Sequence, residues 1–263
     1  MNALKEKIKN NEAVHGCWLS VGSAMNAEIM GKAGFDWLLI DLEHGAGTES
    51  ELPGQLQALS GVPTQAIVRV ESGQPKRIQR VLDIGAAGIM FPQLNTSAEV
   101  AEALGHMVYP PAGTRGAARM VRATDFGLNA NTYFADTRAH LTSMVQIETL
   151  ESLKHLDEIA ALEGTDVLFV GPSDLTFALG IFGQWEHPDY VAALKATVKA
   201  CKNAGKAAGI LLLDSEQYER FYDLGFRVIA CGSDASILLT SAKDLASDLK
   251  NQQILKEKKS REN

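Results

Sequence analysis

Two acidic residues, Glu148 and Asp174, follow short apolar segments at a spacing that suits a shared site. The segment MVQIE ends at Glu148, and DVLFVGPSDL contains Asp174, 26 residues later. One strand–helix–strand unit takes about 30 residues, so the spacing predicts both carboxylates at the carboxyl ends of neighbouring parallel strands. Ligands bind at those ends in parallel α/β proteins. Two carboxylates there offer hard oxygen ligands to Mg²⁺ or Mn²⁺.

The segment Gly171-Pro172-Ser173-Asp174 predicts the start of a helix at the same place. Proline suits the first helical position, which makes Gly171 the N-cap. The backbone amides of Ser173 and Asp174 would then be free to bind an anion such as a substrate carboxylate. Alternatively, Asp174 is only a favourable charge in the first turn of a helix. Glu148 favours the metal site, because two nearby carboxylates need a shared cation or a proton.

Arg69 lies inside the apolar segment AIVRV and needs a partner, since an unpaired buried guanidinium is very costly. The nearest candidates are Asp41, which ends the preceding predicted strand, and Glu43, which follows it. One interpretation is a structural ion pair across adjacent strands. The other is a clamp for a substrate carboxylate or phosphate, which needs the same residue types.

His44 follows Asp41 by three residues, and together with Arg69 the pair suggests an acid/base dyad. The alternative is a hydrogen-bonded structural histidine. Strict strand alternation would place His44 on the face opposite Asp41. Gly45 and Gly47 indicate that the chain has already left the strand, which would let His44 reach the site.

Several other catalytic schemes lack their residues. No lysine ends a predicted strand, so a Schiff-base mechanism has no nucleophile. The chain has no Ser-His-Asp arrangement in a nucleophile elbow, no Walker loop and no GxGxxG after the first strand. The remaining chemistry is metal-assisted: a carbonyl is polarised, an enolate is stabilised and a proton is moved.

Eight apolar segments alternate with helical patterns, which predicts a single (β/α)₈ barrel of the α/β class over residues 1–249, followed by a polar, frayed tail over 250–263. Continuous Val, Ile and Leu runs are typical of strands buried on both faces. The strands are expected at His15–Leu19, Trp37–Asp41, Gln65–Val70, Gly88–Pro92, Ser143–Ile147, Val167–Val170, Ala207–Leu212 and Val228–Cys231. The helices are expected at Asn26–Ala33, Ser50–Leu59, Pro75–Leu82, Ser97–His106, Leu150–Leu162, Asp189–Asn203, Ser215–Leu224 and Ser233–Leu249.

Composition narrows the classes of partner. The net charge of −7 argues against nucleic acid and against anionic membrane surfaces. No apolar run approaches the roughly 18 residues needed to cross a bilayer, and MNALKEKIKN lacks the apolar core of a secretion signal. The three cysteines have neither disulfide nor zinc spacing, so we expect a cytoplasmic protein. The long segment Tyr109–Gly127 and the apolar helix Ile237–Leu249 suggest surfaces covered by other subunits.

Several segments together resemble the HpcH/HpaI aldolase family, from about Gly16 to Leu239. They are AGFDWLLIDLEHG, IVRVESGQPKRIQRVLDIGAAGIMFPQ, YPPAGTRG, VQIET and FVGPSDL. The resemblance implies a (β/α)₈ barrel that holds a divalent metal such as Mg²⁺, Mn²⁺ or Co²⁺ and assembles as a hexamer. It implies reversible cleavage of a 4-hydroxy-2-oxo acid into pyruvate, or a similar 2-oxo acid, and an aldehyde.

The resemblance also implies roles for individual residues. Glu148 and Asp174 resemble the metal ligands, and Arg69 resembles the residue that contacts the 2-oxo group and steadies the enolate. Asp41 and His44 resemble the dyad that moves the aldol proton. A substrate contact is implied for Gln146, and a carboxylate cradle for the amides of Ser173 and Asp174.

Two positions depart from the family pattern. Leu42 stands where many members have glycine in DGEH, and Ser173 stands where alanine is frequent. Neither departure removes a catalytic group, but both bear on the choice of substrate. The alternatives to cleavage are a related condensing synthase, a CoA-thioester lyase of the wider superfamily, or a non-catalytic barrel subunit.

Overall fold

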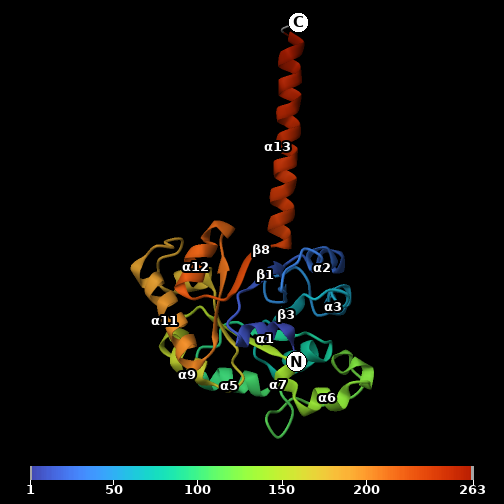
Figure 1. Cartoon of the computed structure of the whole chain (residues 1–263), viewed down its shortest axis with the longest axis vertical. Helices are drawn as coiled ribbons and strands as arrows, with labels where there is room; N and C mark the ends of the chain where they lie inside the picture. The colour runs from blue at the N-terminus through green and yellow to red at the C-terminus, as the bar shows by residue number, and fades with distance from the viewer. Residues whose placement is uncertain (1, 262–263) are drawn as a thin grey trace.

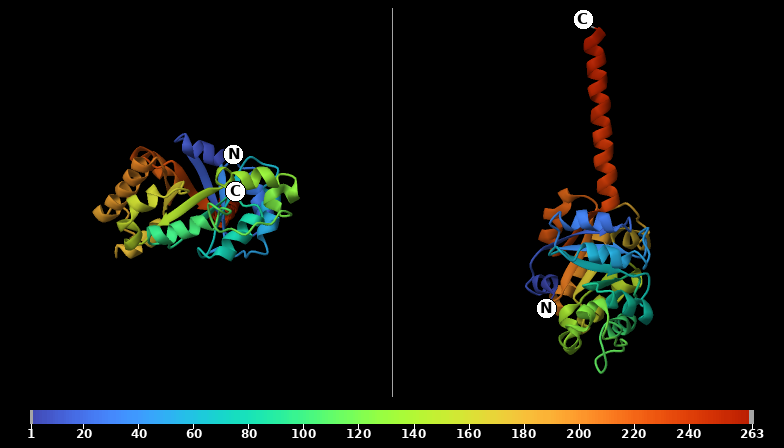
Figure 2. Two further views of the ribbon diagram at one scale, coloured as in Figure 1. Left: turned by 90° about the horizontal axis from the view of Figure 1, so that it is seen from below. Right: turned by 90° about the vertical axis from the view of Figure 1, so that its right-hand side faces the viewer.

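Eight parallel strands close into one barrel in the computed structural model, which describes residues 2–261. Each strand pairs with the next along the chain, and β8 pairs with β1 (Figures 1 and 2). This confirms the predicted (β/α)₈ barrel. The strands are β1 (Val14–Leu19), β2 (Trp37–Asp41), β3 (Gln65–Arg69), β4 (Gly88–Phe91), β5 (Thr142–Ile147), β6 (Val167–Val170), β7 (Ala207–Leu212) and β8 (Val228–Ser233).

The expected helices occur in the predicted order, but two of them are divided. The expected helix over Ser215–Leu224 begins as a separate 3₁₀ segment, and three further short helices were not predicted, at Ala3–Lys9, Ala130–Ala135 and Thr137–His140. The expected helix over Leu150–Leu162 is two helices, because the backbone at His155 leaves helical geometry (φ −103°, ψ 14°). The helices up to β8 are α1 (Ala3–Lys9), α2 (Ala24–Gly31), α3 (Leu52–Ala58), α4 (Pro75–Asp83), α5 (Ser97–Gly105), α6 (Ala130–Ala135), α7 (Thr137–His140), α8 (Leu150–Lys154), α9 (Leu156–Ala161), α10 (Pro172–Ala178), α11 (Pro188–Ala204) and α12 (Tyr218–Leu224), with 3₁₀ segments η1 (Arg122–Gly127) and η2 (Ser215–Gln217).

Side-chain alternation along each strand separates two apolar clusters. On β2, Trp37 and Leu39 belong to the cluster that fills the barrel, whereas Leu38 and Ile40 pack between the sheet and the helices. Successive residues of a strand face opposite sides. Asp41 therefore continues the row of Trp37 and Leu39 and faces the barrel interior at its carboxyl end.

The long segment after α5 is anchored through Arg115, whose side chain is fully buried. Its guanidinium donates to Asp83 (2.6 Å) and to the Tyr133 hydroxyl (3.1 Å), and it lies 4.8 Å from the centre of the Tyr109 ring. A buried charge is tolerated when it is paired and hydrogen-bonded in this way. The segment predicted as a long loop is thus pinned to the barrel at Arg115.

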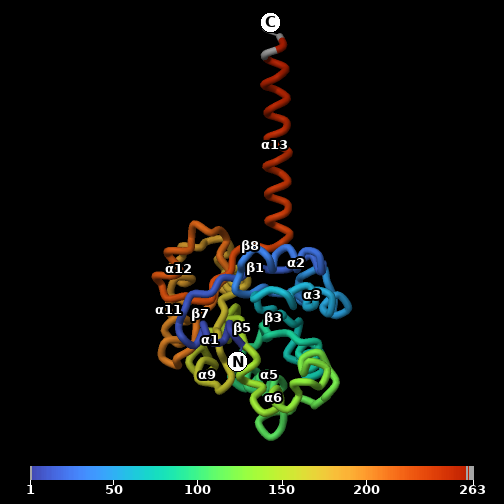
Figure 3. Tube along the Cα trace, turned by 45° about the vertical axis from the view of Figure 1, so that its right-hand side comes forward, coloured from blue at the N-terminus to red at the C-terminus, as the bar shows by residue number. Residues whose placement is uncertain are grey.

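The last helix, α13 (Asp234–Arg261), projects away from the barrel (Figures 1 and 3). Its base is anchored because the Asp234 carboxylate accepts hydrogen bonds from the Ser20 amide (2.8 Å) and from Asn26 (3.2 Å). Every side chain that the structure describes from Ala235 onward is exposed. Along its 28 residues the helix extends about 42 Å at 1.5 Å per residue.

The prediction of a frayed tail after Leu249 is wrong for the residues that the structure describes. Residues 250–261 continue α13 without a break. Lys, Gln, Leu and Glu predominate there, and all four are good helix formers. Residues 262–263 lie outside the described part of the chain.

Candidate active site

Polar side chains from three strands meet at the carboxyl end of the barrel. Asp41 and Arg69 are register partners on β2 and β3. Arg69 lies two residues after Ile67, and Gln146 two residues after Met144, and both apolar residues belong to the interior cluster. The period-two alternation of strands therefore turns Arg69 and Gln146 into the barrel mouth. Active sites of such barrels form at this end.

Arg69 is held by two carboxylates. Its Nε and Nη2 donate to the two oxygens of Asp41 at 2.9 and 2.7 Å, and its Nη1 lies 3.0 Å from Glu43 Oε2. Burial alone would raise the pKa of the Asp41 carboxyl, but the hydrogen bond and charge of Arg69, together with the backbone amides of His44 and Glu43, hold that pKa below its usual value. The ion pair that the sequence suggested is present, and it fixes the plane of the guanidinium.

The chain turns sharply out of the barrel after Asp41. Asp41 Oδ1 accepts the backbone amides of Glu43 (3.0 Å) and His44 (3.2 Å). Gly45 fits the turn because a Cβ at that position would lie 2.2 Å from the Asp41 carbonyl oxygen. The chain has therefore left the strand before His44, as Gly45 indicated, and the His44 side chain lines the mouth.

The structure does not bring the side chains of Asp41 and His44 into contact. Asp41 binds the backbone amide of His44, because its carboxylate oxygens are engaged by Arg69 and the turn. The carboxylate beside the imidazole is that of Glu43, with Oε2 at 3.7 Å from Nε2. Glu43 thus lies between Arg69 and His44, a position that the sequence alone left open.

Glu148 is a buried carboxylate next to other acids. Its Oε1 accepts the Gln93 amide and its Oε2 accepts Gln146 Nε2, both at 2.8 Å. Burial raises the pKa of Glu148 to about 7, and the negative charges of Asp174 and Glu43 add to the rise. The site is electrostatically strained when all these acids are ionised, so it favours a proton or a cation.

Asp174 lies in the first turn of α10, which directly follows β6. Because β6 pairs with β5 and Glu148 directly follows β5, the two acids come from the ends of neighbouring strands, as predicted. Gly171 precedes this helix and approaches Glu148 so closely that a Cβ there would lie 2.7 Å from Glu148 Oε2. No side chain caps the helix, and within the described chain the amides of Ser173 and Asp174 have no backbone partner. Ser173 and Asp174 are both exposed to the mouth.

This donor set fits a hard divalent cation. Within residues 2–261 no cluster of three or more His, Cys, Asp or Glu side chains suits a metal. Two carboxylates are available instead, because Asp174 lies near enough to Glu148 for its charge to raise the pKa of Glu148. Mg²⁺ is commonly bound by one or two carboxylates, with waters and substrate completing its shell. A buried oxygen, Gln146 Oε1, also has no hydrogen-bond partner among the described residues.

The mouth is a hollow of about 320 Å³ with one apolar wall that the sequence analysis missed. Trp18, Phe169 and Leu211 form this wall, beside His44 and Arg69. The Trp18 ring lies 6.0 Å from the Arg69 guanidinium. The sequence contained a signal for this wall, because Trp18 and Phe169 are large aromatic residues near the ends of two predicted strands. In the structure they occupy interior-facing positions of β1 and β6.

Comparison with known proteins gives the family. Residues 15–241 match the HpcH/HpaI aldolase/citrate lyase family. The chain belongs to this family. A hydroxypyruvate/pyruvate aldolase from Paraburkholderia phytofirmans is 38% identical over 256 residues, which cover 95% of this chain and 98% of the relative. A 5-keto-4-deoxy-D-glucarate aldolase from Shigella boydii is 36% identical over 249 residues, covering 95% and 96%.

A solved structure of an HpcH/HpaI family protein from Burkholderia cenocepacia superposes with a TM-score of 0.91 at 35% identity, covering 95% of this chain and all of that one. The predicted family is confirmed, and the protein is an aldolase, a lyase that cleaves a carbon–carbon bond. No helix among the described residues is both long and apolar enough to cross a membrane.

Proposed function

We propose that this aldolase uses a divalent metal to cleave a 4-hydroxy-2-oxo acid reversibly into an aldehyde and pyruvate, or a hydroxypyruvate-like 2-oxo acid. The proposal rests on one observation. The Arg69 guanidinium, fixed by Asp41, lies at the same barrel mouth as the carboxylates of Glu148 and Asp174. The pKa of Glu148, raised to about 7, reflects a site that a cation would relieve. The names of the two aldolase relatives support the substrate class.

Glu148 and Asp174 would hold Mg²⁺, Mn²⁺ or Co²⁺, with the metal supplying Lewis-acid polarisation of the substrate's 2-oxo group. The amides of Ser173 and Asp174 receive the substrate carboxylate, since helix N-terminal amides favour anions. Gln146 contacts the substrate or keeps Glu148 oriented through its 2.8 Å hydrogen bond.

Arg69 and His44 act on the reacting atoms. The Arg69 guanidinium has N–H groups left after its contacts with Asp41 and Glu43, and these donate to the 2-oxo oxygen as negative charge develops there. His44 accepts the proton of the C4 hydroxyl, directly or through water, while the C3–C4 bond breaks. Asp41 holds the turn that carries His44.

The test is a panel of aldehydes offered with pyruvate and with hydroxypyruvate to the metal-stripped protein, alone and with Mg²⁺, Mn²⁺ or Co²⁺. Product formation by chromatography should depend on added metal and should differ between the two 2-oxo acids. If no aldehyde reacts with any metal, although oxaloacetate is decarboxylated, the site forms enolates for a different electrophile and the aldol proposal fails.

We also propose that the protein is a cytoplasmic homo-oligomer, and the family resemblance points to a hexamer. Leu238, Leu245 and Leu249 lie on one face of α13, each more than half exposed, at the three- and four-residue spacing of a packing seam together with Ala242. An apolar helix face that leaves its own barrel is expected to pack against a second copy. The three cysteines are free, which fits a reducing compartment.

A further inference from the structure

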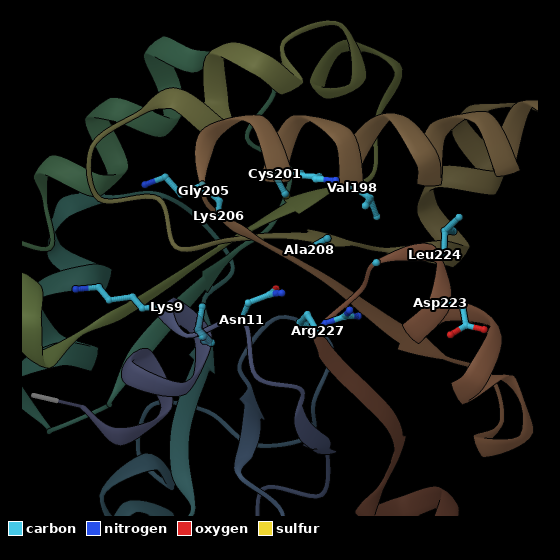
Figure 4. A pocket seen from close by; sticks show the side chains of 13 residues that line it. Lys9, Asn11, Val198, Cys201, Gly205, Lys206, Ala208, Asp223, Leu224 and Arg227 are labelled. Carbon is cyan, nitrogen blue, oxygen red and sulfur yellow. The ribbon is translucent and has the colours of Figure 1, made fainter.

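A second hollow, of about 520 Å³, opens at the amino-terminal end of the barrel, away from the candidate active site (Figure 4). It is lined by α1, by the carboxyl-terminal ends of α11 and α12, and by the chain that enters β7 and β8. Its volume exceeds that of the active-site hollow and lies within the range of small-molecule sites, roughly 300–1,000 Å³. No step of the proposed reaction uses it.

Its lining carries four cationic side chains, Lys9, Lys202, Lys206 and Arg227, and one carboxylate, Asp223. We call it the basic hollow. The whole chain has a net charge of −7, whereas the charged side chains of this hollow are mostly positive. Among the described residues, none of the four cations lies within ion-pair distance of a carboxylate.

The neighbouring lysines of α1 make the contrast clear. Lys5 is paired with Asp166 at 2.7 Å and Lys7 with Asp36 at 2.6 Å, but Lys9 has no such partner in the described chain. The positive charge of the hollow also affects the neighbouring buried residue Lys5. Burial lowers the pKa of Lys5, and despite the opposing effect of Asp166 the positive charges of Lys9 and Lys206 lower it further.

Arg227 presents a fixed guanidinium at this hollow. Its Nη1 donates to the carbonyl oxygens of Tyr222 and Phe226, both at 2.8 Å, and the guanidinium lies 4.0 Å from the centre of the Tyr222 ring. Within residues 2–261, Nε and Nη2 of Arg227 and the Asn11 side chain have no hydrogen-bond partner in the protein. A planar fork that is already oriented suits a carboxylate or a phosphate.

The carbonyl groups at the ends of α11 and α12 do not pair with the lysine ammonium groups of the hollow. Helix C-termini attract cations because their last carbonyls carry partial negative charge. Here the Cys201 and Lys202 carbonyls accept backbone amides of Gly205 and Lys206, and the Tyr222 carbonyl accepts the Gly225 amide as well as Arg227. The ammonium groups of Lys9, Lys202 and Lys206 have no hydrogen-bond partner among the residues described.

We propose that the basic hollow is a second ligand site that binds a small organic polyanion, either a polycarboxylate or a phosphate ester. Several negative charges offset the mutual repulsion of the four cations, and Arg227 receives one acidic group through its free donors. Ile8, Val198 and Leu224 complete the lining and contact the carbon skeleton of the ligand, which favours an organic anion over an inorganic one.

Isothermal titration calorimetry on the metal-free full-length protein, dialysed free of chelator and held at constant ionic strength, tests the site. Tricarballylate and glycerol 2-phosphate are the probes, so that the two sources of negative charge are distinguished. We expect saturable binding of at least one probe. The pair Lys206→Gln and Arg227→Gln should weaken it roughly tenfold or more, as expected when charge-assisted hydrogen bonds are lost.

The matched control is the pair Lys195→Gln and Lys199→Gln, which removes the same charge from exposed positions of α11 outside the lining. This control should change binding less than about twofold. If Arg227→Gln impairs folding, the pair Lys9→Gln and Lys206→Gln replaces it, since neither ammonium group makes a hydrogen bond within the described chain. The proposal is overturned if wild type binds neither probe at millimolar concentration, or if binding survives in both hollow variants.

Discussion

At the scale of single residues, His44 and Glu148 have separable roles in the proposed reaction. Decarboxylation of oxaloacetate needs the enolate but no base for a C4 hydroxyl, whereas aldol cleavage needs both. His44→Ala should therefore slow aldol cleavage roughly 10²-fold, the scale of losing a general base, and spare decarboxylation. Glu148→Ala should slow both reactions, because it removes a proposed metal ligand. Steady-state kinetics of the two reactions on each variant measure this difference.

Glu43 supplies the control for that experiment, because it is the carboxylate beside the His44 imidazole. If His44→Ala leaves aldol cleavage intact, the histidine is structural. In that case Glu43→Gln should show the selective loss of cleavage, which would make Glu43 the base.

Arg69 is expected to act through the planar shape of its guanidinium. Arg69→Lys keeps the charge but cannot reproduce the two-point contact with Asp41 and the contact with Glu43. Turnover should fall roughly 10²-fold for both cleavage and decarboxylation, the scale of losing one donor to a developing oxyanion. A variant that is less stable, yet keeps full turnover in its folded fraction, would show that Arg69 serves only as an ion pair.

Glu148 should make stability depend on pH in the metal-free protein. Its pKa rises from 4.5 to about 7 on folding, so between these values the folded state holds a proton that the unfolded chain has lost. The contribution of Glu148 to the free energy of unfolding therefore falls as pH rises through this window. Urea unfolding at several pH values should show this loss in wild type, relative to Glu148→Gln. Parallel pH profiles of the two proteins would contradict the raised pKa.

At the scale of elements, α13 should carry a subunit contact. Leu245→Lys with Leu249→Lys places charge on its apolar face, where both side chains are exposed in the single chain, and should lower the oligomeric state seen by sedimentation velocity. Ser247→Lys with Asn251→Lys adds the same charge to the other side of the helix and should leave assembly unchanged. An active, monodisperse monomer of wild type at micromolar concentration would refute the assembly itself.

At the scale of the whole molecule, activity and folding should respond differently to metal removal. Glu148 and Asp174 stand on a barrel whose apolar interior is complete without them. Chelation should therefore abolish aldol cleavage while circular dichroism stays unchanged, and added Mg²⁺ or Mn²⁺ should restore the rate. Full activity of the stripped protein would rule out a metal requirement.

The sequence by itself determined the barrel and the charged residues at its mouth. Each apolar run with its following helix is a local signal, and eight such units in order leave one parallel closed architecture. Arg69 was expected beside Asp41 and Glu43 because their segments are successive predicted strands. The spacing of Glu148 and Asp174 likewise followed from the length of one strand–helix–strand unit.

Tertiary structure alone decided how those residues pair and where the chain leaves the barrel. Asp41 bonds to Arg69 and to the turn rather than to the His44 imidazole, since two strands and a loop compete for the same oxygens. The direction in which α13 leaves the barrel depends on the contacts of Asp234 with Ser20 and Asn26 at its base, and these contacts join residues more than 200 positions apart. The basic hollow joins Lys9 to Lys202 and Arg227 across most of the chain, and such charge clusters exist only once the fold has brought distant segments together.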